Sequence, residues 1–337
     1  MKALITGATG RVGSRLAQAL IARGDHVRTL VLPDDPNAEK AQKMGVECLT
    51  GSITNLDDAL RACEGVDTVV HLAALILFFQ KDRPILWDIN VQGTYHVFEA
   101  AVRVAKRPLR MIFAASDQVY PGTHPLYRPI DEVHPRLPNT FYGLSKVIGE
   151  EMLRFYGRTE KDVNISITRF THTEAPEELI DPNGFFARRL FFVNGRLNYL
   201  KEGGSTDPKV LKTIAALEPL AAPDEPLLLA RDPEGNPYYQ ELTDVRDIVQ
   251  GLLLILDKPE AIGEGFNLTP PTVVNMAEFI PYMAEATGRR YVEARLFTDM
   301  PKCHTSGAKA RAILGYNPKY TMFDMIDEAV GRNRAGK

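Results

Sequence analysis

The sequence predicts an α/β protein in which a parallel sheet is covered by helices on both faces. Short β-rich runs alternate with helical stretches through the first half of the chain, a pattern typical of βαβ units. The composition is globular as well, because 45% of the 337 residues are hydrophobic and 25% are charged, which is enough for a sizeable core. The β-rich runs are residues 2–5, 27–32, 46–49, 66–71, 110–114 and 164–170.

Local signals place the helices between these runs. Val12, Leu16 and Leu20 recur at helical spacing after the first run, and Gly24 supplies the positive φ at which such a helix ends. Asn55 is placed to cap a second helix. The further predicted elements are helices over 56–63, from about 141, over 245–256 and over 323–331, and a strand over 265–268.

Charge, cysteine content and hydrophobicity exclude several classes of protein. The 40 basic and 43 acidic residues give a net charge of −3, so no global basic field invites nucleic acid. Cys48, Cys63 and Cys303 are too scattered for a disulfide framework or a metal site. The chain enters its first strand without room for a signal peptide, and its longest apolar run, 69–79, is too short for a membrane span. We expect a soluble, cytoplasmic protein without membrane, nucleic-acid or metal partners.

A glycine-rich loop follows the first predicted strand and opens the first helix. It reads Thr-Gly-Ala-Thr-Gly-Arg-Val-Gly, with glycines at 7, 10 and 13. Glycines in this context form a tight turn, let the backbone approach a pyrophosphate, and allow close packing of helix on strand, while the diphosphate sits at the helix N-terminus. The loop therefore predicts dinucleotide binding on a Rossmann-type doubly wound sheet.

Three side chains form a candidate catalytic set. Tyr142 and Lys146 lie four residues apart on a predicted helix, so they share one face. A cation beside a phenol lowers its pKa from about 10, and the phenolate can then take a proton from a substrate hydroxyl. Ser116 follows the fifth predicted strand, where it can bind the reacting oxygen.

The loop, Ser116 and the Tyr142-x-x-x-Lys146 pair together resemble the short-chain dehydrogenase/reductase superfamily, and in particular its extended branch of NAD-dependent epimerase/dehydratase enzymes acting on sugars. The resemblance runs from Lys2 to about Val330 and is most specific in the first 170 residues. It implies that Ser116, Tyr142 and Lys146 are catalytic. The cofactor-binding residues that it implies are Gly7, Thr9, Gly10, Arg11, Val12, Leu32, Ser52, Ile53, Leu72, Ala73, Ala74, Asn90, Tyr142 and Lys146.

The resemblance also implies an organisation for the chain. Residues 1–170, with about 241–262, would form the NAD(P)-binding domain, and residues 171–240 and 263–337 the substrate-binding or lid region. Residues 174–240 are rich in proline and in aromatic and basic clusters, so we expect short helices and loops there. A homodimer would form through the helices that contain Asn90 and Tyr142, whose apolar side chains include Val97, Val102, Met152 and Phe155.

The cofactor is expected to be NAD, although NADP stays open. The positions where the family carries an acidic residue for NAD or an arginine for NADP fall on Val31 and Leu32, and neither residue suits either role. The lack of an arginine at 32 favours NAD, whereas Arg11 and Arg28 leave NADP possible. The aspartate pair 34–35 either reaches back to the ribose or forms a turn before a proline.

The substrate positions depart from the family pattern. Dehydratases of this branch carry an acidic pair after the serine or threonine, and here the pair is Asp117-Gln118; an amide has no useful basicity, which disfavours simple dehydration. The positions that usually contact a nucleotide-sugar diphosphate fall on His172 and Gln240. Candidate substrate residues are Asp117, Gln118, His172, Gln240 and, in the insertion, Arg188, whose basic neighbours are Arg189, Arg196 and Lys201.

The sequence thus predicts an NAD(P)-dependent oxidoreductase that moves a hydride at a secondary alcohol of a sugar, sugar acid or nucleotide sugar, with Tyr142 as acid/base. Both an epimerase and a dehydrogenase are compatible with this chemistry, and the lost diphosphate ligands favour the dehydrogenase. One alternative is a dehydrogenase or reductase of a non-sugar alcohol or ketone. Another, of a different class, is a non-catalytic dinucleotide sensor on the same fold.

Overall fold

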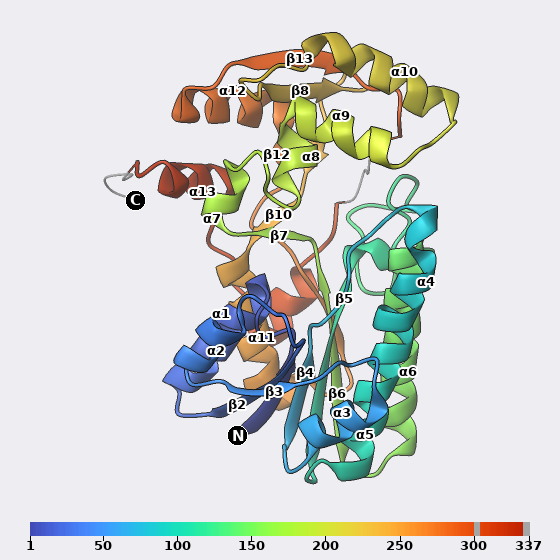
Figure 1. Ribbon diagram of the computed structural model, residues 1–337, viewed down its shortest axis with the longest axis vertical. Coiled ribbons are helices and arrows are strands. Elements are labelled where there is room, and N and C mark those ends of the chain that lie inside the picture. Colours follow the sequence, from blue (N-terminus) through green and yellow to red (C-terminus); the bar gives the residue numbers. More distant parts are fainter. Residues whose placement is uncertain (300–303, 333–337) are drawn as a thin grey trace.

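The computed structural model describes residues 1–299 and 304–332, so Cys303 lies outside the described residues. Figure 1 shows a lower lobe that contains the N-terminus and a central sheet, and a smaller upper lobe that contains β8 (Leu227–Arg231) and β13 (Tyr291–Arg295). The chain passes between the lobes more than once, because β11 (Gly265–Leu268) returns to the central sheet.

The central sheet has seven parallel strands in the order β11-β6-β5-β4-β1-β2-β3. The chain builds outward from β1 to β3, crosses to β4, and then builds outward in the other direction, which is a doubly wound sheet with its switch point between β1 and β4. The predicted fold class is confirmed. The remaining bounds are β1 Lys2–Thr6, β2 His26–Val31, β3 Glu47–Thr50, β4 Thr68–His71, β5 Leu109–Ser116 and β6 Val163–Phe170.

Helices cover both faces of the sheet, as expected from the alternation of elements (Figure 1). One face is covered by α1 (Arg11–Ala22) and α11 (Val245–Asp257), whose Leu16 and Leu252 are fully buried in one apolar cluster. The other face is covered by α3 (Leu56–Cys63), α5 (Thr94–Val104) and α6 (Phe141–Thr159). Burial of both faces explains why the strands read as nearly continuous apolar runs.

The first turn of α3 begins where the sequence predicts it. The side chain of Asn55 accepts hydrogen bonds from the backbone N–H groups of Asp57 (2.9 Å) and Asp58 (3.2 Å), which satisfies two donors that the first turn leaves open. Gly24 and Gly65 follow α1 and α3 with φ of +82° and +69°, the left-handed conformation that favours glycine.

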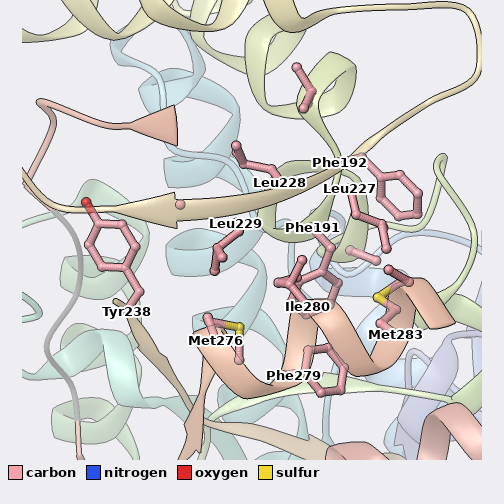
Figure 2. Close-up of a cluster of buried hydrophobic side chains, with 14 of the residues drawn as sticks. Phe191, Phe192, Leu227, Leu228, Leu229, Tyr238, Met276, Phe279, Ile280 and Met283 are labelled. Carbon is pink, nitrogen blue, oxygen red and sulfur yellow. The ribbon is translucent and has the colours of Figure 1, made fainter. Parts of the chain in front are cut away.

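The upper lobe has a hydrophobic core of its own (Figure 2). β8 and β13 pair in parallel. Leu227 and Leu229 of β8 lie on the side of Phe191, Phe279 and Met283, whereas Leu228 lies on the opposite side of the strand. The structure here is more regular than the expected short helices and loops. The helices are α7 Pro176–Leu179, α8 Ala187–Phe191, α9 Val193–Glu202, α10 Pro208–Leu217, α12 Met276–Thr287 and α13 Met322–Ala329.

Short elements complete the fold. Two further strand pairs join β7 with β10 and β9 with β12. β11 belongs to the central sheet although the sequence-based division places residues 263–337 in the other region, because its backbone pairs with β6. The short elements are α2 Ala38–Lys43, α4 Arg83–Leu86, a π-helical segment Trp87–Gly93, β7 His172–Glu174, β9 Tyr239–Gln240, β10 Leu242–Asp244 and β12 Val274–Asn275.

Candidate active site

A cleft lies at the carboxyl ends of β1, β4, β5 and β6, on the side where the switch point places ligands in doubly wound sheets. It offers about 880 Å³ of space, part of it open to solvent. The residues that line it are Gly7, Gly10, Arg11, Val12, Gly13, Leu72, Ala74, Ile76, Phe78, Ala114, Ala115, Ser116, Asp117, Gln118, Tyr142, Lys146, Phe170, Thr171, His172, Thr173 and Phe186.

The glycine loop has the geometry that a pyrophosphate requires. Gly7 has φ of +75°, and a Cβ there would lie 3.1 Å from the backbone of Ala73. A Cβ on Gly13 would lie 2.1 Å from the carbonyl oxygen of Gly7, so only glycine allows α1 to start so close to the loop. Among the described residues, no side chain caps α1, and its first turn has no acidic residue. Its N-terminal N–H groups are thus available to an anion.

The adenosine end of the loop is bounded by a carboxylate. Thr9 Oγ1 donates a hydrogen bond of 2.7 Å to Asp35 Oδ2, and Asp35 Oδ1 accepts the backbone N–H of Asn37 at 2.9 Å, so Asp35 forms a turn and also contacts the glycine loop. Arg11 binds Glu178 through two hydrogen bonds, Nη2 to Oε1 at 2.7 Å and Nε to Oε2 at 2.5 Å. The buried Arg28 donates to two backbone carbonyls and pairs with a glutamate. Arg11 and Arg28, the two arginines that could have bound the extra phosphate of NADP, therefore both have partners within the protein.

Ser116, Tyr142 and Lys146 meet at the cleft, and all three side chains are buried. Lys146 Nζ donates a 2.7 Å hydrogen bond to the carbonyl oxygen of Ala114 and lies 5.8 Å from the centre of the Tyr142 ring. Burial lowers the pKa of Lys146 to about 7. Burial also raises the pKa of Tyr142 above its usual value, against a smaller opposing effect of its hydrogen bond with Ser116. The expected lowering of the Tyr142 pKa is thus not present in this state of the protein.

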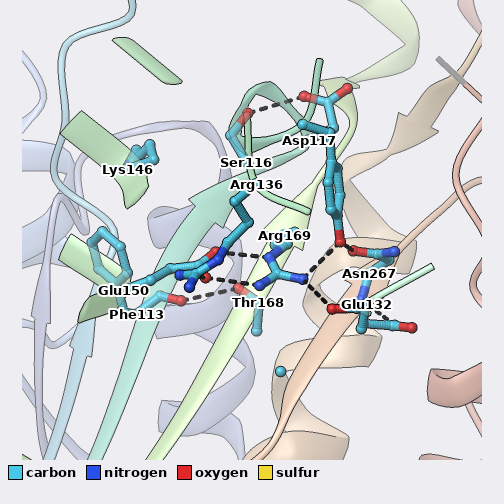
Figure 3. Close-up of polar contacts among 12 residues, drawn as sticks. Phe113, Ser116, Asp117, Glu132, Arg136, Lys146, Glu150, Thr168, Arg169 and Asn267 are labelled. Carbon is cyan, nitrogen blue, oxygen red and sulfur yellow. Dashed lines mark hydrogen bonds and ion pairs between the residues drawn. The ribbon is translucent and has the colours of Figure 1, made fainter. Parts of the chain in front are cut away.

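Two buried carboxyl groups lie beside the catalytic set. Ser116 Oγ donates to Asp117 Oδ1 at 3.0 Å (Figure 3), and burial raises the pKa of Asp117 to about 6. Burial raises the pKa of Glu241 to about 8, with a further contribution from the charge of Asp117. The carboxylate of Glu241 accepts hydrogen bonds from the N–H (2.9 Å) and hydroxyl (2.8 Å) of Thr305. Glu241 is therefore a second buried acid whose charge interacts with that of Asp117, although it lies outside the cleft lining.

Asn90 holds the wall of the cleft. Its side chain exchanges two 2.9 Å hydrogen bonds with the backbone of Leu75 and donates to Ser145 Oγ at 3.3 Å. It therefore ties the segment after β4 to α6, the helix of Tyr142. This is a supporting position and not a contact with the cleft.

Arg169 is held below the cleft by a buried network (Figure 3). Its Nε and Nη2 bind Glu150 at 2.7 and 2.8 Å, and Nη1 donates to Tyr120 Oη at 2.7 Å. Tyr120 in turn donates to Asn267 of β11 at 2.9 Å. Arg169 thus joins α6, β6 and β11 and is fully engaged.

The cleft lining includes some predicted residues and omits others. Among the described residues, those predicted for the cofactor or substrate that lie outside the lining are Thr9, Leu32, Ser52, Ile53, Ala73, Asn90, Arg188 and Gln240. Leu32 and Arg188 are exposed, whereas Gln240 is buried in β9. Ser52 Oγ instead contacts Thr54 Oγ1 at 2.8 Å.

The sequence analysis missed the aromatic part of the lining. Phe78 and Phe186 enter the cleft from segments far apart in the chain. Phe78 lies edge-on to Tyr142 with ring centres 5.8 Å apart, and Phe186 lies edge-on to His172 at 4.8 Å. Burial, with the nearby charge of Arg189, lowers the pKa of His172 to about 4, so His172 is neutral at pH 7. The Phe-Phe-Ala-Arg-Arg cluster at 185–189 was the available signal.

The described residues include neither a helix suited to span a membrane nor a cluster suited to bind a metal ion. None of the helices in residues 1–299 and 304–332 combines the length and hydrophobicity needed to cross a bilayer. Over the same ranges, no three His, Cys, Asp or Glu side chains gather in a way that would hold a metal ion.

The fold and cleft define a dinucleotide-binding enzyme of the Rossmann type. The sequence model of the NAD dependent epimerase/dehydratase family matches residues 3–269, and the chain belongs to this family. A short-chain dehydrogenase/reductase superfamily protein from Agrobacterium tumefaciens, solved with bound NAD, superposes with a TM-score of 0.88 at 34% identity, covering 98% of this chain and 97% of that one. The predicted family, enzyme class and cofactor are confirmed.

Curated relatives include dehydrogenases of sugars. A uronate dehydrogenase from Pseudomonas syringae pv. tomato is 34% identical over 157 residues, which is 45% of this chain and 53% of that protein. The match thus spans about half of that relative's length. The L-arabinose 1-dehydrogenase (NAD(P)(+)) of Haloferax volcanii is 26% identical over 261 residues, 71% of this chain and 91% of that protein.

Proposed function

We propose that this protein is an NAD-dependent oxidoreductase that transfers a hydride at a secondary alcohol of a sugar or sugar acid, with Tyr142 as the general acid/base. The observation that carries the proposal is the meeting of Ser116, Tyr142 and Lys146 in the cleft that the glycine loop also lines. The similarity to uronate and arabinose dehydrogenases supports a carbohydrate substrate.

Ser116, Tyr142 and Lys146 each have a separate role in the proposed reaction. When bound, NAD supplies the hydride acceptor. Ser116 Oγ binds the reacting hydroxyl, Tyr142 Oη takes its proton, and the Lys146 ammonium stabilises the phenolate. Because burial raises the pKa of Tyr142 and lowers that of Lys146, the pair needs an additional positive charge in the cleft before Tyr142 can act as a base near neutral pH.

The product is proposed to leave, as in a dehydrogenase. His172 and Gln240 occupy the positions of the usual diphosphate ligands, and neither side chain offers the bidentate cation that a diphosphate favours. Residues 171–240 are proposed as the main part of the substrate-binding region, since His172, Thr173 and Phe186 line the cleft. Of the expected second part, 263–337, β11 and residues 310–316 belong instead with the central sheet, where Ala310, Leu314 and Tyr316 are buried. An epimerase that returns the hydride to the same substrate is the other outcome.

The test is an absorbance screen at the NADH band with NAD or NADP and a panel of free sugars, uronic acids and nucleotide sugars. A rise with a free sugar or sugar acid supports the dehydrogenase. Absence of a rise, with a nucleotide sugar isomerised, identifies an epimerase. Absence of both, with NAD still bound, identifies the non-catalytic sensor.

Tyr142→Phe separates catalysis from binding. It should lower turnover by about 10²-fold or more, the usual contribution of a general acid/base, and leave NAD affinity within about twofold. Tyr291→Phe, on an exposed tyrosine of β13 outside the cleft lining, is the matched control and should leave both unchanged. Undiminished turnover in Tyr142→Phe would remove Tyr142 from the mechanism.

We also propose a homodimer through α5 and α6. Tyr95, Leu144 and Phe155 on these helices are 41%, 40% and 52% exposed, an unusual amount of large apolar surface for one face. Val97, which the sequence suggested for this interface, is buried in the core of its own lobe and is therefore not part of the proposed interface. Molar mass measured by light scattering at several concentrations tests the dimer.

A further inference from the structure

Arg189 of α8 has an unusual environment for an arginine. Its guanidinium is half-buried, and Cζ lies near the centres of four aromatic rings. Within the described part of the chain, its side chain makes no hydrogen bond and no ion pair. The rings and their distances from Cζ are Phe78 4.9 Å, Phe186 4.9 Å, Tyr199 5.3 Å and Phe185 5.8 Å.

Other enclosed arginines in this protein have acceptors. Arg11 binds the carboxylate of Glu178, and Arg169 binds that of Glu150. A guanidinium carries five N–H donors in a planar fork, and those of the half-buried Arg189 have no acceptor among the described residues. Burial lowers the pKa of Arg189, because the charge is withdrawn from water without a partner that restores it. The donor fork of Arg189 is therefore poised for an acceptor from outside the chain.

The neighbouring acid does not fill this role. The charge of Glu174 raises the pKa of Arg189, but among the described residues its carboxylate makes no hydrogen bond to the guanidinium, and its Oε2 has no hydrogen-bond partner. Oε1 accepts the backbone N–H of Phe186 at 2.9 Å, and Oε2 lies 3.8 Å from Nη2 of Arg11. The aromatic rings meanwhile hold the guanidinium in place by cation–π contact, which orients the charge without satisfying its N–H groups.

Arg189 lies next to the cleft lining, against the rings of Phe78 and Phe186, which both line it. Phe78 contacts both Arg189 and Tyr142, with distances from its ring centre of 4.9 Å to Cζ and 5.8 Å to the Tyr142 ring centre. Because the two distances share one ring, Cζ lies within about 11 Å of the Tyr142 ring centre, a gap that a single hexose-sized molecule can bridge. Phe186 likewise joins Arg189 to His172 in the cleft wall.

We propose that Arg189 binds a carboxylate of the substrate, and that this protein therefore selects a sugar acid over the corresponding neutral sugar. The inference rests on the proposed dehydrogenase function and specifies its substrate class. One planar fork matches a carboxylate through two parallel hydrogen bonds. The insertion thus supplies a monoanion site in place of the diphosphate ligands that positions 172 and 240 lack.

A carboxylate fits this site better than a phosphate. A dianion favours several converging donors, whereas Arg188 is exposed and Arg11 is bound to Glu178. The nearby carboxyl of Glu174, whose pKa burial raises to about 7, would also repel a dianion more strongly than a monoanion.

The test compares Arg189→Gln and Arg189→Lys with Arg188→Gln, a matched change at the neighbouring exposed arginine. kcat/KM is measured for the pairs glucuronate and glucose, and galacturonate and galactose. The wild type should prefer each acid. Arg189→Gln should lower kcat/KM for the acids at least tenfold, mainly through KM, with little change for the neutral sugars. Arg189→Lys should fall between, since it keeps the charge but loses the fork, and Arg188→Gln should match the wild type.

A binding measurement keeps this inference separate from the proposed activity. Glucuronate, glucose and glucose 6-phosphate are titrated by calorimetry into protein saturated with NADH, where oxidation cannot occur. Arg189-dependent binding of glucuronate without turnover would support the carboxylate site and contradict the dehydrogenase. Turnover of a neutral sugar, equal in wild type and Arg189→Gln, would support the dehydrogenase and overturn the site. Tighter Arg189-dependent binding of glucose 6-phosphate than of glucuronate would overturn the choice of a carboxylate. Thermal unfolding of each variant checks its fold.

Discussion

We propose that Asp35 carries the cofactor preference, in a place that the family pattern does not mark. The usual positions fall on Val31 and Leu32, and Leu32 is exposed, yet the carboxylate four residues after Val31 reaches Thr9 of the glycine loop. A carboxylate here favours two ribose hydroxyls and repels the extra phosphate of NADP. Asp35→Ala should therefore lower kcat/KM with NAD about tenfold and raise the relative use of NADP. Asp34→Ala is the control, and an unchanged NAD/NADP ratio in Asp35→Ala would contradict this role.

Glu241 should give stability a measurable dependence on pH. Burial raises its pKa from 4.5 to about 8, so between these values the folded protein binds more protons than the unfolded chain. The free energy of unfolding then falls as pH rises through this window. Glu241→Gln should reduce the difference between the free energies of unfolding at pH 5 and pH 7, which denaturant unfolding measures at each pH. Glu293→Gln, at a half-exposed side chain, should leave the dependence as in the wild type.

The residues proposed as catalytic carry local signals in the sequence, whereas those proposed to bind the substrate do not. Ser116, Tyr142 and Lys146 carry local signals, namely a strand end and a helical spacing of four. Phe78, Phe186 and Arg189 converge only after two distant segments have folded against each other, and no local pattern encodes that contact. The 185–189 cluster marks this segment, but which of its arginines lies among the aromatic rings depends on how the short helix α8 packs.

At the start of α1, close packing and cofactor binding depend on the same glycine. An added Cβ at Gly13 would meet the Gly7 carbonyl at 2.1 Å, so Gly13→Ala should push the glycine loop from its place. We expect a loss of about 1–3 kcal/mol of stability and at least a tenfold loss of NAD affinity. Gly24→Ala, at φ of +82° with no atom within 4 Å of the added Cβ, should cost about 1–2 kcal/mol and leave NAD affinity unchanged. Equal NAD affinity in the two variants would contradict the role of the loop.

Element boundaries were predictable where a cap or a turn marks them. α3 begins after its Asn55 cap as predicted, and β11 spans the expected residues. β8 was not predicted, because a short run of leucines after a proline suits a buried helix as well as a strand. Its partner β13 lies some sixty residues later in the chain, and such a pairing leaves no local trace.

Across the whole molecule, the Glu150–Arg169 pair joins α6 to the sheet and to β11. Removing one partner of a buried ion pair leaves an uncompensated charge. Glu150→Ala should therefore lower the free energy of unfolding by about 3–5 kcal/mol, measured by denaturant unfolding. Glu151→Ala, on the next residue with a side chain 49% exposed, should cost less than about 1 kcal/mol. Similar losses in the two variants would show that the buried pair does not stabilise the fold.

The order of strands in the sheet has a consequence for the folding of the protein during its synthesis on the ribosome. β6 is complete once Phe170 has been made, but its neighbour β11 begins only at Gly265. At roughly 5–20 residues per second, translation leaves the β6 edge uncovered for several seconds. An uncovered strand edge is a template for pairing with other chains, so the nascent chain is most exposed to self-association, and to chaperone capture, while its upper lobe is being synthesised.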